Sequence, residues 1–317
     1  DAVFPQHRVK EPKHTRITCV CIGSNSYSLG TDGEAMHKQI ALLADDGEPL
    51  HVSITGKGSP LLLLHGWTAS HAAWSPLLEQ LSQRHQLIRP DARGHGGHSL
   101  SVTQTPDVAR LARDVLNLLD HLGIAQATIA GHSMGALTLW QFIRDFGTSR
   151  LANICLLDQS PKLVTDMQWR MGIYGAFSGE DSGQLIDDLT KDWPDSVLRL
   201  VANGLNDKAR STYLRNTSGW RAMRLELSRY DPGPLIAIWK SLVAADFRDV
   251  LPRIDVPTLL VYGCQSNFYT MDTARYVAAR ISGSVLHLYE DADHCPHLLQ
   301  PQRFLEDFEA FTRPIMH

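Results

Sequence analysis

The sequence predicts an α/β fold with a doubly wound, mostly parallel sheet and an inserted helical cap. Short apolar runs alternate with segments of helical length along most of the chain, which is typical of this fold class. Residues 61–64 are four consecutive leucines, the composition of a strand buried on both faces. Residues 131–135, Gly-His-Ser-Met-Gly, separate an apolar run from a helix-like segment, which indicates a sharp strand-to-helix turn.

The first elements follow from turn residues. Residues 1–36 are polar and show no sustained periodicity, so we expect an arm of uncertain order that is dispensable for chemistry. Strands are expected at residues 40–43, 50–54 and 61–64. Asp46-Gly47 lies between the first two, which favours a hairpin.

The next elements alternate between helix and strand. Thr105 and Pro106 are predicted to cap and open a helix with one apolar face, and Gly123 is predicted to end it. A second helix is expected at residues 136–146, after Ser133. The remaining predictions are strands at residues 87–89, 127–130, 154–157, 258–262 and 285–289, and a terminal helix at 301–312.

Residues 161–251 interrupt this alternation. They are helix-like, contain no convincing buried strand and are expected to form a helical cap inserted between two core parts, residues 37–160 and 252–317. We expect most aromatic side chains of the insertion to pack against one another, and a minority to line an apolar pocket. These residues are Trp169, Tyr174, Phe177, Trp193, Tyr213, Trp220, Tyr230 and Trp239.

Composition restricts the partners and the compartment. A net charge of −4 gives no reason to expect nucleic acid, and no apolar run approaches the ~20 residues of a membrane span. The expected partner is a small-molecule substrate, and the oligomeric state is open. The five cysteines, at 19, 21, 155, 264 and 295, are scattered, so we expect no disulfide framework, no metal and a reducing, cytoplasmic location. Because the chain begins at Asp1, a removed export signal stays an alternative.

Ser133 is the predicted nucleophile, since a strained elbow would expose its hydroxyl at a helix N-terminus. A serine needs a base, and the loops at the carboxyl ends of parallel strands converge near the elbow. The loop after the last strand contains His294 and His297. His294 is the better candidate because it comes early in the loop, whereas His297 begins the turn towards the terminal helix and is expected at the surface.

These motifs together resemble the α/β-hydrolase superfamily. The matching segments are His65-Gly66-Trp67, residues 91–96 (Asp-Ala-Arg-Gly-His-Gly), the serine elbow and residues 291–294 (Asp-Ala-Asp-His). The resemblance covers residues 39–317 except the cap. It implies that Ser133 attacks, that His294 transfers the proton and that the backbone N–H groups of Trp67 and Met134 stabilise the oxyanion, at roughly 3 kcal/mol per donor.

The acid that orients the histidine departs from the common pattern of the superfamily. Most members place it after the strand predicted at 258–262, but the next carboxylate there is Asp272, which we expect to cap a helix. Asp158 follows the buried strand at 154–157, and some members carry their acid at this place. A carboxylate at the end of a hydrophobic strand needs a partner, which an imidazole N–H would supply. We therefore predict Asp158 as the acid.

The resulting hypothesis is a serine hydrolase without a cofactor that cleaves a carboxylic ester, or a related acyl bond such as a thioester or lactone, of a small apolar or aromatic substrate. One alternative comes from a second resemblance, to cofactor-independent dioxygenases that open alkylquinolone-type rings. Those enzymes share the acid position and the His-Gly-Trp segment, and histidines flank their serine. Here His132 matches that pattern and Met134 does not. A third alternative is a non-enzymatic small-ligand receptor on the same fold.

Overall fold

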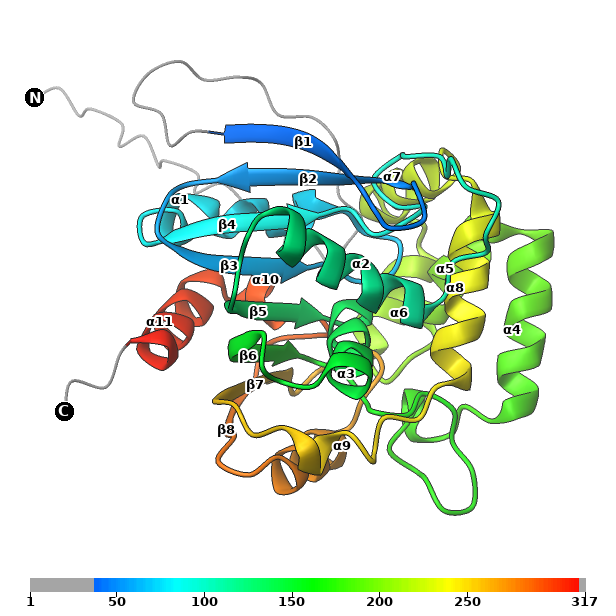
Figure 1. Ribbon diagram of the computed structural model, residues 1–317. Helices are drawn as coiled ribbons and strands as arrows, with labels where there is room; N and C mark the ends of the chain where they lie inside the picture. The colour runs from blue at the N-terminus through cyan, green and yellow to red at the C-terminus, as the bar shows by residue number, and fades with distance from the viewer. Residues whose placement is uncertain (1–36, 314–317) are drawn as a thin grey trace, which may run out of the picture.

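The computed structural model of the protein describes residues 37–313, so the expectation for the arm lies outside the described residues. Eight strands form one sheet in the order β1-β2-β4-β3-β5-β6-β7-β8 (Figure 1). The strands are β1 (His37–Leu43), β2 (Pro49–Thr55), β3 (Ser59–Leu64), β4 (His85–Pro90), β5 (Ala127–His132), β6 (Leu151–Leu157), β7 (Thr258–Gly263) and β8 (Val285–Tyr289).

The sheet is antiparallel only at one edge. β1 pairs with β2, and β2 pairs with β4, in antiparallel register, whereas all the other pairs are parallel. Gly47 turns the β1–β2 hairpin with a φ of +88°, a conformation that costs little for glycine. The mostly parallel sheet and the hairpin confirm the sequence prediction.

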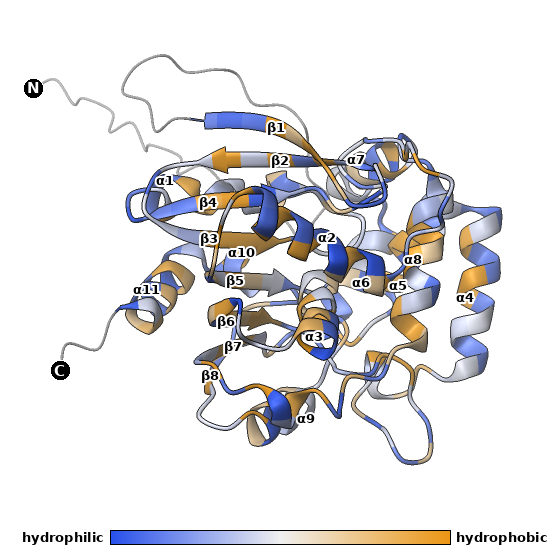
Figure 2. Ribbon diagram, viewed as in Figure 1, coloured by the Kyte–Doolittle hydropathy of each residue, from blue (hydrophilic) through white to orange (hydrophobic). Residues whose placement is uncertain are grey.

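The leucines of β3 explain why this strand lies in the middle of the sheet. Leu62 and Leu64 belong to one hydrophobic cluster, and Leu61 and Leu63 belong to the other, as the two-residue period of a strand requires. All four are at most 6% exposed. Figure 2 shows the hydrophobic colouring that runs along this strand. The prediction of a strand buried on both faces is confirmed.

Helices cover both faces of the sheet. α2 (Val108–His121), α3 (Met134–Phe146) and α9 (Met271–Arg280) contribute to the cluster that contains Leu62. α1 (Leu78–Leu81) and α11 (Pro301–Thr312) contribute to the other cluster, and the short α10 (Pro296–Leu299) precedes α11. The terminal helix has the predicted bounds.

The start of α2 differs from the prediction. Its N-cap is Asp107, whose side chain accepts a hydrogen bond from the Arg110 N–H at 2.7 Å, and not Thr105. Pro106 therefore precedes the cap and does not lie in the first turn. Aspartate and threonine side chains both accept a hydrogen bond from a free N–H at the start of a helix, and the sequence has one of each within three residues. Gly123 follows the helix with a φ of +63° and ends it as predicted.

Residues 161–251 contain five α-helices, a short 3₁₀ helix at Ile173–Gly175, two isolated bridges and no strand. The helices are α4 (Gly179–Lys191), α5 (Trp193–Ala202), α6 (Asp207–Leu214), α7 (Ser218–Leu227) and α8 (Pro232–Ala244), which we call the helical segment. Its helices lie beyond the carboxyl ends of the parallel strands (Figure 1). That is the edge where the loops after β5, β6 and β8 meet, so the segment borders the predicted site.

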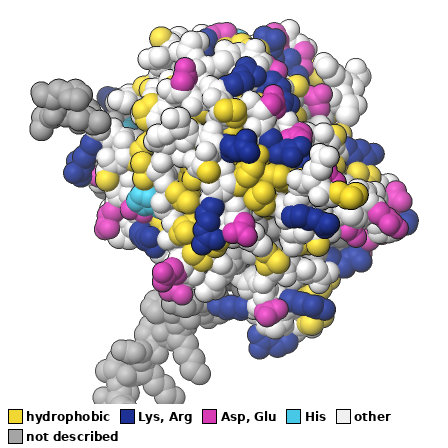
Figure 3. Space-filling model, turned by 90° about the horizontal axis from the view of Figure 1, so that it is seen from below, with side chains coloured by type: hydrophobic (Ala, Val, Ile, Leu, Met, Phe, Trp, Pro, Cys, Tyr) yellow, Lys and Arg dark blue, Asp and Glu magenta, His cyan; other side chains and the backbone are white. Residues whose placement is uncertain are grey.

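The surface carries charges of both signs. On the face shown in Figure 3, basic and acidic side chains are interspersed with hydrophobic ones. Pairs such as Arg248 with Asp246, at 2.6 Å, are examples of this mixing. Across the described residues, every helix is too short or too polar to span a bilayer.

Candidate active site

Ser133 lies at the sharp turn between β5 and α3. Its φ of 53° and ψ of −115° lie outside the regions that residues other than glycine favour, so the backbone here is strained. The Ser133 N–H donates to the carbonyl of Leu157 in β6 at 3.1 Å, which holds the turn against the neighbouring strand. The sequence prediction of a strained serine elbow is thus met in backbone geometry.

The two glycines of the elbow are needed for close backbone approach. A Cβ on Gly135 would lie 2.3 Å from the Leu64 carbonyl oxygen, and a Cβ on Gly131 would lie 2.5 Å from the Gly135 carbonyl oxygen. Neither glycine has a positive φ. The motif therefore requires glycine at these positions because α3 begins directly against β3 and β5, and any side chain would push the helix away.

Asp158 and His294 meet at the carboxyl edge of the sheet. Asp158 follows β6, His294 follows β8, and the His294 Nδ1 lies 2.6 Å from the Asp158 Oδ2. The Asp158 side chain is fully buried, whereas the His294 side chain is 12% exposed. A carboxylate can only accept, so Nδ1 carries the proton and Nε2 is left as the basic nitrogen.

Ser266 is a second partner of the carboxylate that sequence reasoning missed. Its hydroxyl donates to the Asp158 Oδ2 at 2.6 Å and accepts from the N–H groups of Phe268 and Tyr269 at 3.2 and 3.3 Å. Ser266 lies in the loop after β7, where the superfamily pattern usually has its acid. The absence of a carboxylate before Asp272 indicated only that this loop does not supply the acid, and nothing in the sequence pointed to Ser266.

Burial acts on both members of the pair. It raises the pKa of Asp158 to about 7, opposed first by the hydrogen bond from Ser266 and then by the nearby His132. It lowers the pKa of His294 to about 3. Both shifts disfavour charge, so His294 is neutral at pH 7 and able to accept a proton. Its contact with the carboxylate favours the imidazolium that would form on proton transfer.

Two residues that competed with this pair lie elsewhere. The Asp272 side chain is 75% exposed and pairs with Arg275 at 3.0 Å. It lies in the first turn of α9, whose N-cap is Thr270, so the expectation that Asp272 is the cap was wrong. His297 was expected at the surface but is 1% exposed. Its ring packs 4.8 Å from that of Trp74, because the chain has already turned into α10 beneath the sheet.

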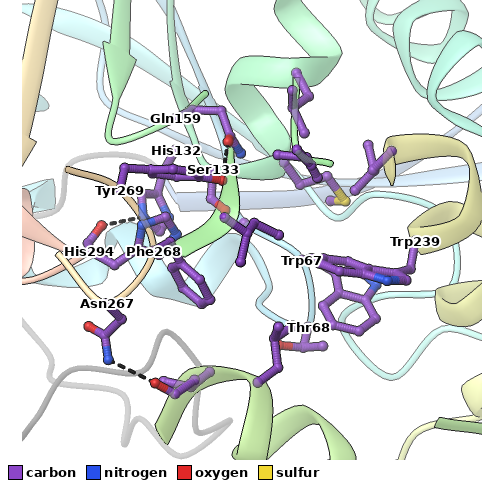
Figure 4. Close-up of a pocket in the computed structure, with 18 of the residues that line it drawn as sticks. Trp67, Thr68, His132, Ser133, Gln159, Trp239, Asn267, Phe268, Tyr269 and His294 are labelled. Carbon is purple, nitrogen blue, oxygen red and sulfur yellow. Dashed lines mark hydrogen bonds between the residues drawn. The ribbon is translucent and has the colours of Figure 1, made fainter. Parts of the chain in front are cut away.

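Ser133 and His294 line one cavity of about 80 Å³ together with Trp67 and Met134 (Figure 4). Asp158 lies behind His294 and does not line it. Much of the remaining lining is apolar and comes from α3, α5, α8 and the loop after β6. These residues include Leu137, Leu163, Val197, Leu200, Trp239 and Leu242.

Trp67 connects the loop after β3 to the helical segment. Its indole Nε1–H donates to the Leu235 carbonyl of α8 at 2.9 Å, and its ring lies 4.5 Å from that of Trp239. Trp239 is the one aromatic of the eight singled out in the insertion that lines the cavity. Among the other seven, the three tryptophans and Phe177 are buried, and the three tyrosines are half-buried. Met134 begins α3, so its N–H lies at the positive end of a helix dipole.

His132 was noted in the sequence only as a flank of the serine. Its Nε2 donates to the backbone carbonyl of His294 at 2.8 Å, and the two rings lie 4.8 Å apart. This bond ties the elbow to the loop that carries the predicted base. Among residues 37–313, no group of side chains has the arrangement of a metal site. Cys155 is buried, and Cys19 and Cys21 lie outside the described residues.

Comparison with known proteins gives the family. The sequence model of the family described as "Alpha/beta hydrolase family" matches residues 61–307 of this chain. The chain is 25% identical to 3-oxoadipate enol-lactonase 1 of Acinetobacter baylyi, over 85% of this chain and 95% of the relative. It is 26% identical to the pimeloyl-[acyl-carrier protein] methyl ester esterase of Nitrosomonas europaea, over 82% of this chain and 98% of the relative.

A solved structure agrees in fold. The esterase EaEST from Exiguobacterium antarcticum superposes with a TM-score of 0.72 at 22% identity, over 86% of this chain and 98% of that chain. Sheet order, serine elbow and sequence match point the same way. The chain therefore belongs to the alpha/beta hydrolase family.

Proposed function

We propose that this carboxylic ester hydrolase works through an acyl-enzyme on Ser133, with His294 as the base and Asp158 as the acid that orients it. One observation carries the proposal: the His294 Nδ1 lies 2.6 Å from a fully buried carboxylate, while the same imidazole and Ser133 line one cavity. A buried aspartate, an imidazole and a strained serine in this order form the constellation of acyl transfer.

The proposed reaction begins when the Ser133 Oγ attacks the ester carbonyl and the His294 Nε2 takes the hydroxyl proton. The N–H groups of Met134 and Trp67 would stabilise the negative oxygen of the tetrahedral intermediate, each by roughly 3 kcal/mol. The imidazolium then gives its proton to the leaving alcohol, and the acyl group stays on Ser133. A water molecule, activated by the same imidazole, releases the acid and restores the enzyme.

The cavity favours a small uncharged substrate. Its lining among the described residues includes no Lys, Arg, Asp or Glu. A carboxylate on the substrate would thus lose its hydration without gaining a counter-charge, which is costly. Leucine, valine and tryptophan side chains supply the contact area for a short aliphatic or aromatic acyl group.

The test is hydrolysis of a panel of p-nitrophenyl esters of graded acyl length by the parent, by Ser133→Ala and by Ser101→Ala. Ser101 is an exposed serine outside the cavity lining and serves as the matched control. We expect Ser133→Ala to lose about 10⁴-fold or more in turnover and the control to lose nothing. Near-parental turnover by Ser133→Ala would refute the acyl-enzyme mechanism.

The same proteins are incubated with an alkylquinolone under oxygen. Ring opening there, without ester turnover in the parent, would move the assignment to the dioxygenase alternative. Tight ligand binding with neither reaction would favour the receptor.

A further inference from the structure

Gln159 follows Asp158 directly and lines the cavity, yet the proposed chemistry does not use it. It is 2% exposed, and its backbone carbonyl accepts a hydrogen bond from the Tyr262 hydroxyl at 2.6 Å. Gln159 lies close to the serine elbow, because the Ser133 N–H donates to the carbonyl of Leu157, two residues before Gln159 in the chain. The side chain is therefore held beside the reacting serine.

The orientation of the Gln159 amide follows from its partners. The Ser160 N–H donates to Oε1 at 2.7 Å, and the Tyr269 hydroxyl donates to the same atom. A backbone N–H can only donate, so the atom in contact with it must be the oxygen. The Nε2 group, with two N–H donors, has no hydrogen-bond partner within residues 37–313. Because Gln159 lines the cavity, these two donors are available to a ligand.

The Gln159 amide lies on the His294 side of the cavity. The hydroxyl of Tyr269 donates to the Gln159 amide, and the Tyr269 ring lies 6.0 Å from the His294 ring. The Phe268 ring lies 4.6 Å from the same imidazole. Trp67 and Trp239 pack together on the other side of Ser133 (Figure 4). In acyl transfer the leaving alcohol must be near the imidazole that protonates it. The alcohol therefore occupies the side of Gln159, and the acyl group occupies the side of the tryptophans.

We propose that the Gln159 Nε2 donates a hydrogen bond to an acceptor oxygen on the leaving alcohol, so that the enzyme prefers esters whose alcohol carries an uncharged ether, carbonyl or hydroxyl oxygen close to the ester bond. The inference rests on the proposed function, since it needs His294 as the proton donor to the leaving group. Gln159 then determines specificity for the alcohol, while the apolar wall receives the acyl chain.

A matched pair of substrates tests this. Butyl butyrate and 2-methoxyethyl butyrate have the same length and the same acyl group, and they differ by one oxygen in place of a methylene. Both form the same butyryl-enzyme, so a difference in kcat/KM belongs to the acylation step and its leaving alcohol. The measurement is titration of released butyric acid, and the quantity is the ratio of kcat/KM for the ether ester to that for the alkyl ester.

The variants are Gln159→Met, which has a similar volume and no donor, and Gln159→Glu, which keeps an acceptor for Ser160 and Tyr269 but loses both donors. We expect this ratio to fall about 5-fold or more in each, the loss typical of one hydrogen bond. Intrinsic reactivity of the two esters cancels because the parent and its variants are compared. Gln141→Met is the control, since Gln141 lies in α3, bonds to Asp145 and does not line the cavity.

An unchanged ratio in both Gln159 variants, with normal thermal melting, would overturn the inference. So would a parallel fall for the acyl-side pair, ethyl methoxyacetate and ethyl butyrate, in place of the alcohol-side pair, because it would place the acceptor on the acyl group. Failure of the proposed function is a different result: Ser133→Ala would then hydrolyse butyl butyrate at the parental rate.

Discussion

The substitution Asp158→Asn examines the predicted acid most sharply, and the contacts of the carboxylate determine its effect. Oδ2 accepts from both His294 and Ser266, at 2.6 Å each, and Oδ1 has no hydrogen-bond partner within residues 37–313. An asparagine that keeps its oxygen in the Oδ2 position holds the imidazole but lacks the charge that stabilises an imidazolium. One that turns its nitrogen towards His294 forces Nδ1 to accept, which puts the proton on Nε2.

Either arrangement removes the base or its stabilisation. Loss of the aspartate in a triad lowers turnover by ~10⁴-fold, equivalent to about 5 kcal/mol in the barrier. Little of this loss of turnover comes from misfolding, because asparagine has nearly the same shape as aspartate and carries no charge.

The control is Asp272→Asn. Its side chain is 75% exposed and, within residues 37–313, bonds only to Arg275, so we expect turnover within about 2-fold of the parent. The assay is steady-state hydrolysis of p-nitrophenyl butyrate by the three proteins, with thermal melting as the folding check. The reasoning is refuted if Asp272→Asn is the severe variant and Asp158→Asn the mild one.

Three further predictions concern the same neighbourhood. Ser266→Ala removes a donor to the Asp158 carboxylate, so it should raise the pKa of that group. In a pH–rate profile, the acid limb of kcat/KM should then move up by ~1 pH unit. An acid limb that does not move would contradict the role of Ser266. Gly135→Ala places a Cβ 2.3 Å from the Leu64 carbonyl oxygen and should lower the free energy of unfolding in urea by ~3 kcal/mol or more. Its control is Gly283→Ala, where nothing lies within 4 Å, so that variant should lose only the strain energy of a positive φ. Equal losses in the two variants would contradict the packing argument. Because burial raises the pKa of Asp158 to about 7, its folded form binds a proton that the unfolded chain has lost, so this group makes stability fall as pH rises from ~4 to ~7; Asp158→Asn should remove that slope, and an unchanged slope would show that other groups cause it.

The strand positions and the elbow could be predicted because they depend on short sequence signals. Four leucines in a row need two apolar faces, and a Gly-x-Ser-x-Gly segment between strand and helix leaves one backbone path. The terminal helix, residues 301–312, also has the predicted bounds. The start of α2 was missed by two residues because Thr105 and Asp107 are both good caps, and only the packing of the helix selects between them.

The support of the site was less predictable than its central residues. Asp158 was chosen because the loop after β7 lacks a nearby carboxylate, and the structure brings Asp158 to His294. Ser266 and Gln159 gave no comparable signal, since a serine in a loop and a glutamine after a strand are common. Their positions follow from how β6 and β7 end next to each other, which is a property of the sheet. His297 was misplaced because its burial depends on the direction of α10.

The central claim is that Ser133 carries the acyl group, and mass spectrometry of the quenched enzyme tests it most directly. The parent is mixed with excess p-nitrophenyl butyrate, quenched with acid within the first turnover and digested. We predict one butyryl group on the peptide that contains Ser133, absent from Ser133→Ala, which should also be inactive. Undiminished hydrolysis by Ser133→Ala, with no acylated peptide in the parent, would contradict the account.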